Sequence, residues 1–563
     1  MAYTLGLDYG TNSVRCVLVD TSNGEEIGTC VYAYETGDMG IILDSRDHNV
    51  ARQHPADYLK GIQVTVTGAI ADAQNTTPGF DPAHIIGIGV DTTGSTPIPV
   101  DAEGRPLALK TKFQDNINAY AWLWKDHSGH VEAAEITALA EIEHPEYLAK
   151  CGGTYSSEWF FSKLLRCLRA DPGVFDAAVT WVEHADWIPA VLTGTEHPKK
   201  IKRCRCAAGH KAMFNAAWGG YPAKEFLCQL DPKLGRLRDT LSDTTYTIAD
   251  QAGTLTETWA TKLGLRAGIP VAIGAFDAHF GAVGCGIQPG TLVKIIGTST
   301  CDMVVASNQE ELADVPGICG IVDGSILPGY FGLEAGQSAV GDIFSWYVNT
   351  IKPDRLDHAA LTEEAMTLKP GQSGLLALDW NNGNRTVLVD QRLTGLLLGQ
   401  TLHTKPGEIF RALVEATAFG ALTIINRFEE YGIKIDQVIN CGGISEKNAM
   451  IMQIYADITD REMKISRSAQ TCALGTAIAA AVVAGEQAGG YDTFAEAQQA
   501  MCGIKTKSFK PMPENVAVYK KLYALYKQLH DSFGLPQHTA DLSQLMKDLL
   551  AIKEAANANP EVL

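Results

Sequence analysis

The stretch Val271 to Gly286 reads V-A-I-G-A-F-D-A-H-F-G-A-V-G-C-G, and it predicts how the chain is organised. The apolar run 269–273 is typical of a buried strand, and Asp277 follows shortly after it. Open α/β sheets hold their ligands at the carboxyl ends of their strands, so this carboxylate is a candidate catalytic group. The simpler interpretation, that Asp277 only caps the next helix, is the one the stretch favours when taken alone.

The bulk composition narrows the class of protein. A length of 563 residues predicts three to four domain-sized units or two large ones, and 46% apolar with 20% charged residues is typical of a globular protein. The formal charge of −19 argues against non-specific binding of nucleic acid. An anionic ligand would therefore need local help from backbone N–H groups, a metal ion and a few basic side chains.

The distribution of cysteines and apolar runs bears on location. The thirteen cysteines are scattered and form no CxxC pair, which predicts reduced thiols in a cytoplasmic protein without structural zinc. The start lacks a basic region followed by an apolar one, and no run of 18 apolar residues occurs. We therefore expect neither a signal peptide nor a membrane span.

Two stretches share a plan of strand, small polar turn and strand. The first is residues 3–19, with a turn at 8–13, and the second is residues 291–305, with a turn at 297–300. Turns of this kind aim backbone N–H groups and hydroxyls at phosphate oxygens, although plain hairpins with Gly-Thr turns are common. Asp8 beside the first turn is a natural Mg²⁺ anchor, direct or through water, and Arg15 is the one nearby cation.

A second pair of stretches strengthens the impression of a repeat. Residues 85–96 and 438–448 each form an apolar strand that ends in glycine and hydroxyl residues. A faint duplication of this kind predicts two halves whose turns face one cleft and clamp a triphosphate between them. The chain has no G-x-x-x-x-G-K-[ST] loop and no G-x-G-x-x-G after a strand, so ATP would be bound by the two hairpins.

The string Trp124-Lys125-Asp126-His127 suggests a polyol site. Aromatic rings cover C–H faces while charged groups bond hydroxyls, although half-buried surface aromatics are commoner than such sites. Lys211 is expected in a loop, where a lysine is usually only solvated. Further along, a long helix is predicted at about 406–431 and two tail helices at 514–533 and 542–556.

These strings together resemble the FGGY family of carbohydrate kinases, within the actin-like, ribonuclease H-like ATPases, over nearly the whole chain. The strings that carry the resemblance are G-L-D-Y-G-T-N-S-V-R at 6–15, G-V-D-T-T-G-S-T-P at 89–97, G-G-T-Y-S-S-E-W-F at 152–160, A-G-H-K at 208–211, G-A-F-D-A-H-F-G-A-V-G at 274–284, I-G-T-S-T-C-D at 296–302, G-L-E-A-G-Q-S-A at 332–339 and C-G-G-I-S-E-K-N at 441–448. Many family members carry a W-x-D-x-R-type string where this chain has W-K-D-H at 124–127. That departure weakens a xylulose or glycerol kinase and fits the branch that acts on L-ribulose.

The resemblance implies a role for each matching residue. The implied site comprises Asp277 as catalytic base, Gly94, Lys211 and Glu334 on the sugar, Gly10, Thr11 and Ser13 near the transferred phosphate, with Arg15 carried over less directly, Gly297 and Thr298 on the nucleotide phosphates, Gly443 and Asn448 near the adenosine, and Asp8 on Mg²⁺. The aromatic string adds Trp124 and Asp126 to the sugar side.

The resemblance also implies fold, activity and partners. It predicts an α/β fold with two actin-like (ribonuclease H-like) ATPase domains flanking a central cleft: residues 1–287 with the sugar site and residues 288–563 with the nucleotide site. The implied reaction is ATP- and Mg²⁺-dependent phosphorylation of L-ribulose at O5, in L-arabinose catabolism, by a possible homodimer. Two alternatives stay open: another pentulose or polyol as acceptor (D-ribulose, xylulose, ribitol), or an actin- or chaperone-like ATPase that uses nucleotide as a switch.

Overall fold

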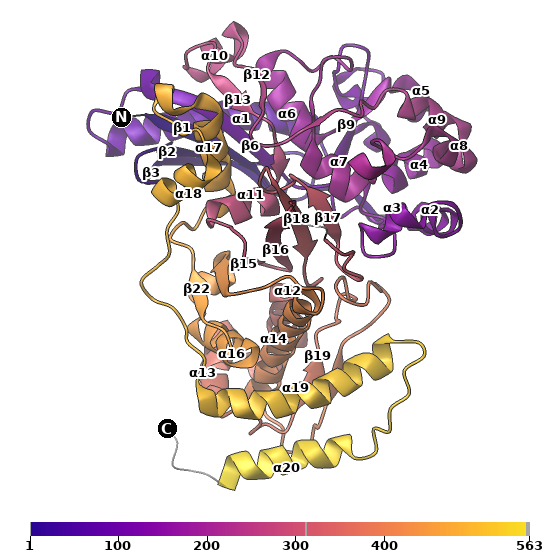
Figure 1. The fold of residues 1–563 in the computed structure, drawn as a ribbon, viewed down its shortest axis with the longest axis vertical. Coiled ribbons are helices and arrows are strands. Elements are labelled where there is room, and N and C mark those ends of the chain that lie inside the picture. Colours follow the sequence, from indigo (N-terminus) through magenta and orange to yellow (C-terminus); the bar gives the residue numbers. More distant parts are fainter. Residues whose placement is uncertain (1, 310–311, 559–563) are drawn as a thin grey trace.

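A computed structural model describes residues 2–309 and 312–558, with one main sheet in the upper part of the molecule and a second in its middle (Figure 1). The first sheet has the order β12-β13-β6-β1-β2-β3, and β14 also pairs with β6. Its strands are β1 (Tyr3–Tyr9), β2 (Ser13–Asp20), β3 (Glu26–Ala33), β6 (Ile85–Thr92), β12 (Gln251–Thr254), β13 (Pro270–Ala272) and β14 (Ala275–Phe276).

The second sheet is built from the later part of the chain. Its order is β17-β18-β16-β15-β21-β22. Its strands are β15 (Thr291–Ile296), β16 (Thr300–Ser307), β17 (Gly320–Asp323), β18 (Tyr330–Ala335), β21 (Gln437–Cys441) and β22 (Met463–Ile465).

The two sheets repeat one topology. β1 pairs antiparallel with β2 and parallel with β6, and in the same way β15 pairs antiparallel with β16 and parallel with β21. The next neighbours match as well, since β2–β3 and β16–β18 are antiparallel while β6–β13 and β21–β22 are parallel. The duplication suggested by the two hairpins is therefore confirmed, and with it the predicted two-part α/β fold.

One helix of the second half packs on the first sheet. α17 (Thr471–Ala484) lies against β1 and β6, and Figure 1 shows it with α18 (Phe494–Met501) beside the N-terminal strands. Glycines permit this close approach: a Cβ on Gly6 would lie 1.9 Å from the Ala473 carbonyl oxygen, and one on Gly89 would lie 2.0 Å from that of Thr476. A helix from the part of the chain after residue 288 therefore packs on the sheet of the first half. The predicted domain boundary at 287/288 stays a prediction.

Helices fill the space around the first sheet. α1 (Pro55–Thr76) covers β2 and β3, and a helical insertion between β8 (Ala121–Trp122) and β12 forms its own apolar core. The helices between β8 and β12 are α2 (His130–Glu143), α3 (Pro145–Ala149), α4 (Phe160–Ala170), α5 (Pro172–Ala177), α6 (His184–Thr193), α7 (Arg205–Ala212), α8 (Lys224–Leu230) and α9 (Pro232–Arg238), and α10 (Glu257–Leu263) and α11 (Asp277–Gly284) follow β12. Lys211 lies in α7, so the expectation of a loop there is wrong.

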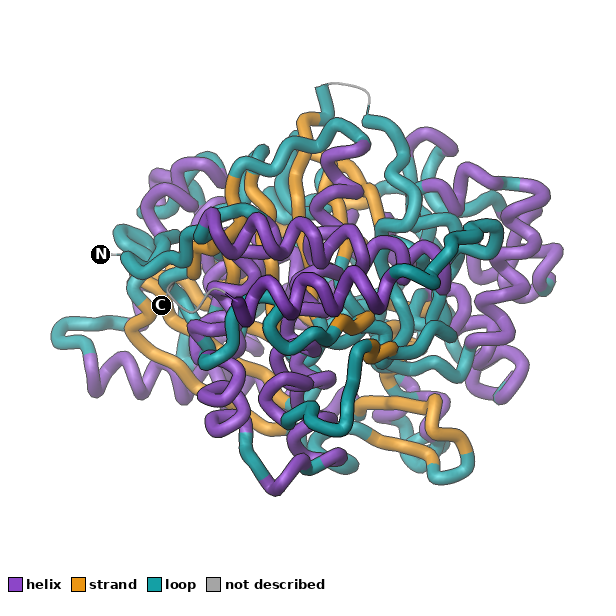
Figure 2. Tube along the Cα trace, turned by 90° about the horizontal axis from the view of Figure 1, so that it is seen from below, coloured by secondary structure: helices purple, strands orange, loops and turns teal. Residues whose placement is uncertain are grey.

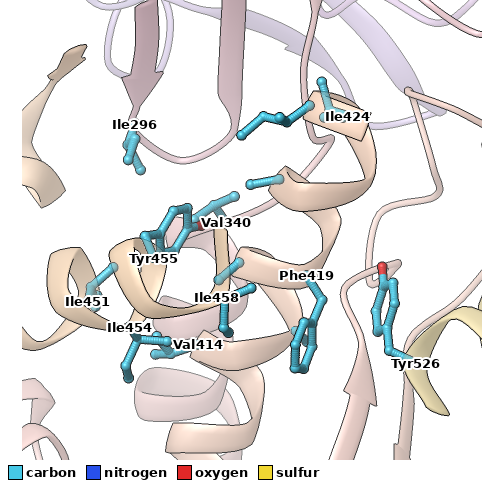
Figure 3. Packing of buried hydrophobic residues seen from close by; sticks show 14 of the residues in the cluster. Ile296, Val340, Val414, Phe419, Ile424, Ile451, Ile454, Tyr455, Ile458 and Tyr526 are labelled. Atoms are coloured by element: carbon cyan, nitrogen blue, oxygen red, sulfur yellow. The ribbon is translucent and has the colours of Figure 1, made fainter. Parts of the chain in front are cut away.

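The second half has a large core of its own. α14 (Pro406–Glu430) and α16 (Ala449–Thr459) pack together in it, and Figure 3 shows Val414, Ile454 and Ile458 among its side chains. α19 (Pro513–Gly534) and α20 (Leu545–Ala558) lie side by side across the far end, as Figure 2 shows from below. The predicted long helix and both tail helices are therefore confirmed.

Two further expectations concern cysteines and membranes. All thirteen cysteines are free thiols, as the sequence predicted. Within residues 2–309 and 312–558, none of the helices combines the length and the apolar character that a bilayer-crossing helix needs.

We expect Gly6→Ala to lower the free energy of unfolding by about 1–3 kcal/mol, because the added methyl group must push α17 off the first sheet. The measurement is chemical denaturation followed by circular dichroism. Gly173→Ala in α5 is the matched control, since the nearest atom to its Cβ would be a side-chain oxygen of Asp171 at 3.3 Å. Equal unfolding midpoints for the two variants would contradict the close packing of α17.

Candidate active site

A cavity of about 270 Å³ lies where the two halves meet. Both hairpin turns reach it, through Thr11 of the first and Thr298 of the second, and Asp277 reaches it from the start of α11. Its lining also includes Gly94, Trp124, Glu158, Lys211, Phe276, His279, Ser299, Glu334 and Arg385. The structure therefore brings residues far apart in the sequence to one place, as the two-turn hypothesis requires.

Asp277 is the first residue of α11, so its carboxylate lies at the junction of β14 and the helix. The helix N-cap is Phe276, which makes no side-chain capping bond, so the interpretation of Asp277 as the N-cap is wrong. Asp277 Oδ1 accepts a hydrogen bond from the Ala278 N–H at 2.6 Å. Burial, followed by the negative charge of Asp8, raises the pKa of Asp277 to about 7, which suits a general base at neutral pH.

Lys211 and Glu334 form a buried ion pair across the two halves. The Lys211 Nζ, from α7, lies 3.0 Å from each carboxylate oxygen of Glu334, from β18. Burial disfavours the Glu334 carboxylate, but the Lys211 ammonium outweighs it and holds the pKa of Glu334 below its usual range. Both residues line the cavity beside Asp277, so the pair presents fixed charges to a polar ligand.

The two turns have related local geometry. The Gly10 N–H donates to the Ser13 carbonyl at 2.9 Å, and the Gly297 N–H donates to the Ser299 carbonyl at 2.9 Å. A Cβ on Gly297 would find its nearest neighbour only at 3.9 Å, and one on Gly443 would meet nothing within 4 Å. Open space beside bare backbone is what a phosphate or ribose needs, so these positions fit the predicted nucleotide side.

Asp8 stands where the sequence suggested a metal anchor. Its side chain is 18% exposed, and Arg15 Nη1 lies 3.9 Å from Oδ2. Across the parallel strands Asp8 is paired with Asp91, whose carboxylate is fully buried. Burial, then the charges of Asp8 and Asp277, raises the pKa of Asp91 well above its usual range. Carboxylates of this kind are hard oxygen donors, so Asp8 fits Mg²⁺.

Gly94 and Trp124 are held at the cavity by one buried lysine. Lys163 Nζ, from α4, donates to the carbonyls of Ser95 at 2.7 Å and Leu123 at 2.8 Å. A Cβ on Gly94 would lie 1.8 Å from the Phe276 ring, so only glycine fits there. The Trp124 Nε1–H donates to Thr11 Oγ1 at 3.0 Å, which ties the aromatic wall to the first turn.

Asp126 is not placed as predicted. It is fully buried, pairs with Arg52, accepts the Ala51 N–H at 2.7 Å and the Ser128 hydroxyl at 2.6 Å, and does not line the cavity. The expectation that it bonds a sugar hydroxyl is therefore contradicted. In the string Trp124 to His127, Trp124 lines the cavity whereas Asp126 is a buried structural carboxylate. The spacing of the residues in the sequence does not distinguish these two roles.

Two further predicted residues, Gly443 and Asn448, follow strand β21 of the second sheet. Gly443 begins α15 (Gly443–Lys447), after β21, which pairs with β15. The Asn448 side chain caps α16 by accepting the Ile451 N–H at 3.1 Å, and its amide donates to Thr362 Oγ1 at 3.2 Å. Its predicted place near the adenosine stays a prediction, because this side chain already has a structural role.

Several residues of the cavity lining were not predicted as site residues from the sequence, among them His279, Glu158 and Arg385. His279 and Glu158 both lie inside strings that carry the family resemblance, at 274–284 and 152–160, and either could have been noticed there, whereas Arg385 lies in no such string. Glu158 comes from the first half and Arg385 from the second, with 3.8 Å between Oε1 and Nη2. They meet only through the fold.

Known proteins resemble this chain over nearly its full length. A ribulokinase of Halalkalibacterium halodurans is 43% identical over 98% of this chain and 97% of its own length. A ribulokinase of Mycolicibacterium smegmatis is 39% identical over 94% of both chains. The fold is shared with a xylulose kinase from Rhodospirillum rubrum (TM-score 0.77, 22% identity, 94% of this chain and 99% of that one).

Two family models match successive parts of the chain and together cover most of it. Residues 3–284 match the N-terminal domain, and residues 292–484 the C-terminal domain, of the FGGY family of carbohydrate kinases. The duplicated sheets, the cavity between them and these matches agree, and the chain belongs to the FGGY family of carbohydrate kinases.

Proposed function

We propose that this protein transfers the γ-phosphoryl group of ATP to O5 of L-ribulose, giving L-ribulose 5-phosphate in L-arabinose catabolism. The observation that carries the proposal is that Asp277 and both phosphate-type turns line one cavity. The similarity to proteins named ribulokinase at up to 43% identity supports the choice of acceptor.

The proposed chemistry depends on Asp277. A primary hydroxyl is a poor nucleophile at neutral pH, and a carboxylate with a pKa of about 7 accepts its proton as the oxygen attacks the γ-phosphorus in line. General-base help is worth about 10²–10⁴ in rate. Positioning of the reactants accounts for much of the remainder in phosphoryl transfer.

Other residues would orient the two substrates. Lys211 and Glu334 would bond sugar hydroxyls through a donor and an acceptor held 3.0 Å apart, while the backbone of Gly94 borders the same space. Backbone N–H groups of the two turns would hold the phosphates, and Asp8 would hold Mg²⁺, which neutralises charge on the transferred phosphoryl group. Closure of the two halves would exclude water, a competing acceptor.

We expect Asp277→Asn to lower kcat by at least about 10²-fold with a modest effect on the KM of the sugar, because only the proton acceptor is lost. The measurement is steady-state ADP release with L-ribulose, together with the unfolding midpoint as a control for folding. The asparagine keeps the acceptor for the Ala278 N–H. Near-normal turnover by a folded variant would exclude Asp277 as the base.

We expect kcat/KM to rise with pH and to level off above an apparent pKa of about 7. The reason is that a base must be deprotonated, and burial with the neighbouring Asp8 charge raises the pKa of Asp277 to about 7. The measurement is the pH profile of kcat/KM from pH 5 to 9. A flat profile across pH 6–8 would show that no group of this pKa takes the proton.

The second candidate keeps the reaction and changes the acceptor. We expect L-ribulose to give the highest kcat/KM in an ADP-release panel with D-ribulose, L- and D-xylulose, ribitol and glycerol. A higher rank for any of these would establish another pentulose or polyol as the acceptor. Turnover of ATP that no sugar stimulates would instead indicate a nucleotide-driven switch.

A further inference from the structure

A buried cluster of two histidines surrounds Glu334. His210 Nδ1 lies 3.5 Å and His279 Nε2 lies 3.9 Å from Glu334 Oε2, and all three residues are buried. The roles proposed so far for Lys211 and Glu334 leave both imidazoles without a task. His279 is the one of the two that lines the cavity.

His279 is a neutral ring with unused hydrogen-bonding capacity. It is 2% exposed, and neither ring nitrogen has a hydrogen-bond partner in the residues that the structure describes. Burial lowers the pKa of His279 to about 4, so at neutral pH the ring carries one N–H donor and one acceptor nitrogen. Buried polar groups are normally paired, and an unpaired one that faces a cavity indicates a bound partner.

The contacts of His210 show that this ring offers no hydrogen-bond donor to Glu334. The Ser325 hydroxyl donates to the Val322 carbonyl at 3.1 Å, so its oxygen accepts from His210 Nε2–H at 2.9 Å. The His210 Nδ1 is then an acceptor that faces the Glu334 carboxylate, another acceptor. The acceptors in this cluster, the Glu334 carboxylate and His210 Nδ1, therefore outnumber the donors, and the Lys211 ammonium supplies only part of the hydrogen bonds that they can accept.

We propose that His279 binds an oxygen of the sugar, a hydroxyl or the keto group, in the space between its imidazole and Glu334. The inference rests on the proposed function, because it adds a specificity-determining residue to the same site. A gap of 3.9 Å between His279 Nε2 and Glu334 Oε2 is too long for a direct hydrogen bond, but a hydroxyl oxygen within reach of both groups can bridge it. Asp277, two residues earlier on α11, then faces the reacting end of the same sugar.

A metal ion is the competing occupant. One ligand atom each of His210, His279 and Glu334 lies within 4.8 Å of the others, a spacing that suits zinc. The Lys211 ammonium, however, already lies 3.0 Å from both Glu334 oxygens, and a dication there would be placed against a fixed positive charge. A neutral polyol meets no such repulsion, so the geometry favours the sugar.

The test compares His279→Leu with His184→Leu in the full chain. His184 in α6 is a matched control, since it is 1% exposed, both its ring nitrogens are unpartnered and it does not line the cavity. We expect His279→Leu to raise the KM of L-ribulose by about 10- to 100-fold with the KM of ATP unchanged, and His184→Leu to change neither. His279→Gln or His279→Asn should restore part of the affinity, because an amide nitrogen takes the place of Nε2 or Nδ1.

Monodeoxy analogues of L-ribulose separate recognition from packing. Loss of one particular hydroxyl should weaken the wild type by about 10- to 100-fold and the His279→Leu variant by little, since the hydroxyl and the imidazole are then coupled. Equal losses in both proteins for every analogue would overturn the proposal. So would calorimetric zinc binding to the wild type that disappears in the variant while the sugar KM in zinc-free buffer is unchanged. If the wild type does not phosphorylate L-ribulose at all, the proposed function fails, independently of His279.

Discussion

The buried ion pair between Lys211 and Glu334 is the interaction on which the site depends. It joins α7 of the first half to β18 of the second, and each partner would be an uncompensated buried charge without the other. Because the pair exists only when the halves meet, it couples the formation of the cavity to their approach. The same charges lie beside Asp277, so one contact serves both the shape and the electrostatics of the site.

Three aspartates make this part of the site acidic. Asp8 and Asp91 lie on the neighbouring strands β1 and β6, and Asp277 begins α11 directly after β14, which also pairs with β6. In this buried setting the charge of Asp8 raises the pKa of Asp91 and of Asp277, and the charge of Asp277 adds to the rise at Asp91. A cluster of this kind repels an anionic nucleotide unless a cation intervenes. The net charge of −19 adds to this repulsion, so an anionic ligand beside these carboxylates would need a compensating cation or backbone N–H donors.

The repeated sheets explain how a two-sided site arises from one plan. Each half places a hairpin turn at the carboxyl end of its first strand, and the close packing of α17 against Gly6 and Gly89 fixes one half against the other. The turns then face a common space, and neither half alone encloses it. The helical insertion of the first half adds a further wall of the cavity through Trp124 and Lys211.

The sequence by itself determined the duplicated α/β plan and the two turns, and it singled out Asp277 as a candidate catalytic group, because strand periodicity, glycine turns and strand-end carboxylates are local patterns. It placed Lys211 in a loop and gave Asp126 to the sugar, and only the tertiary structure assigned them to helix α7 and to a buried pair with Arg52. It gave no pattern for Arg385, and it left His279 unremarked inside a string chosen for Asp277. Burial, ion pairing and cavity lining result from contacts between residues far apart in the chain, and the local spacing of residues does not predict such contacts.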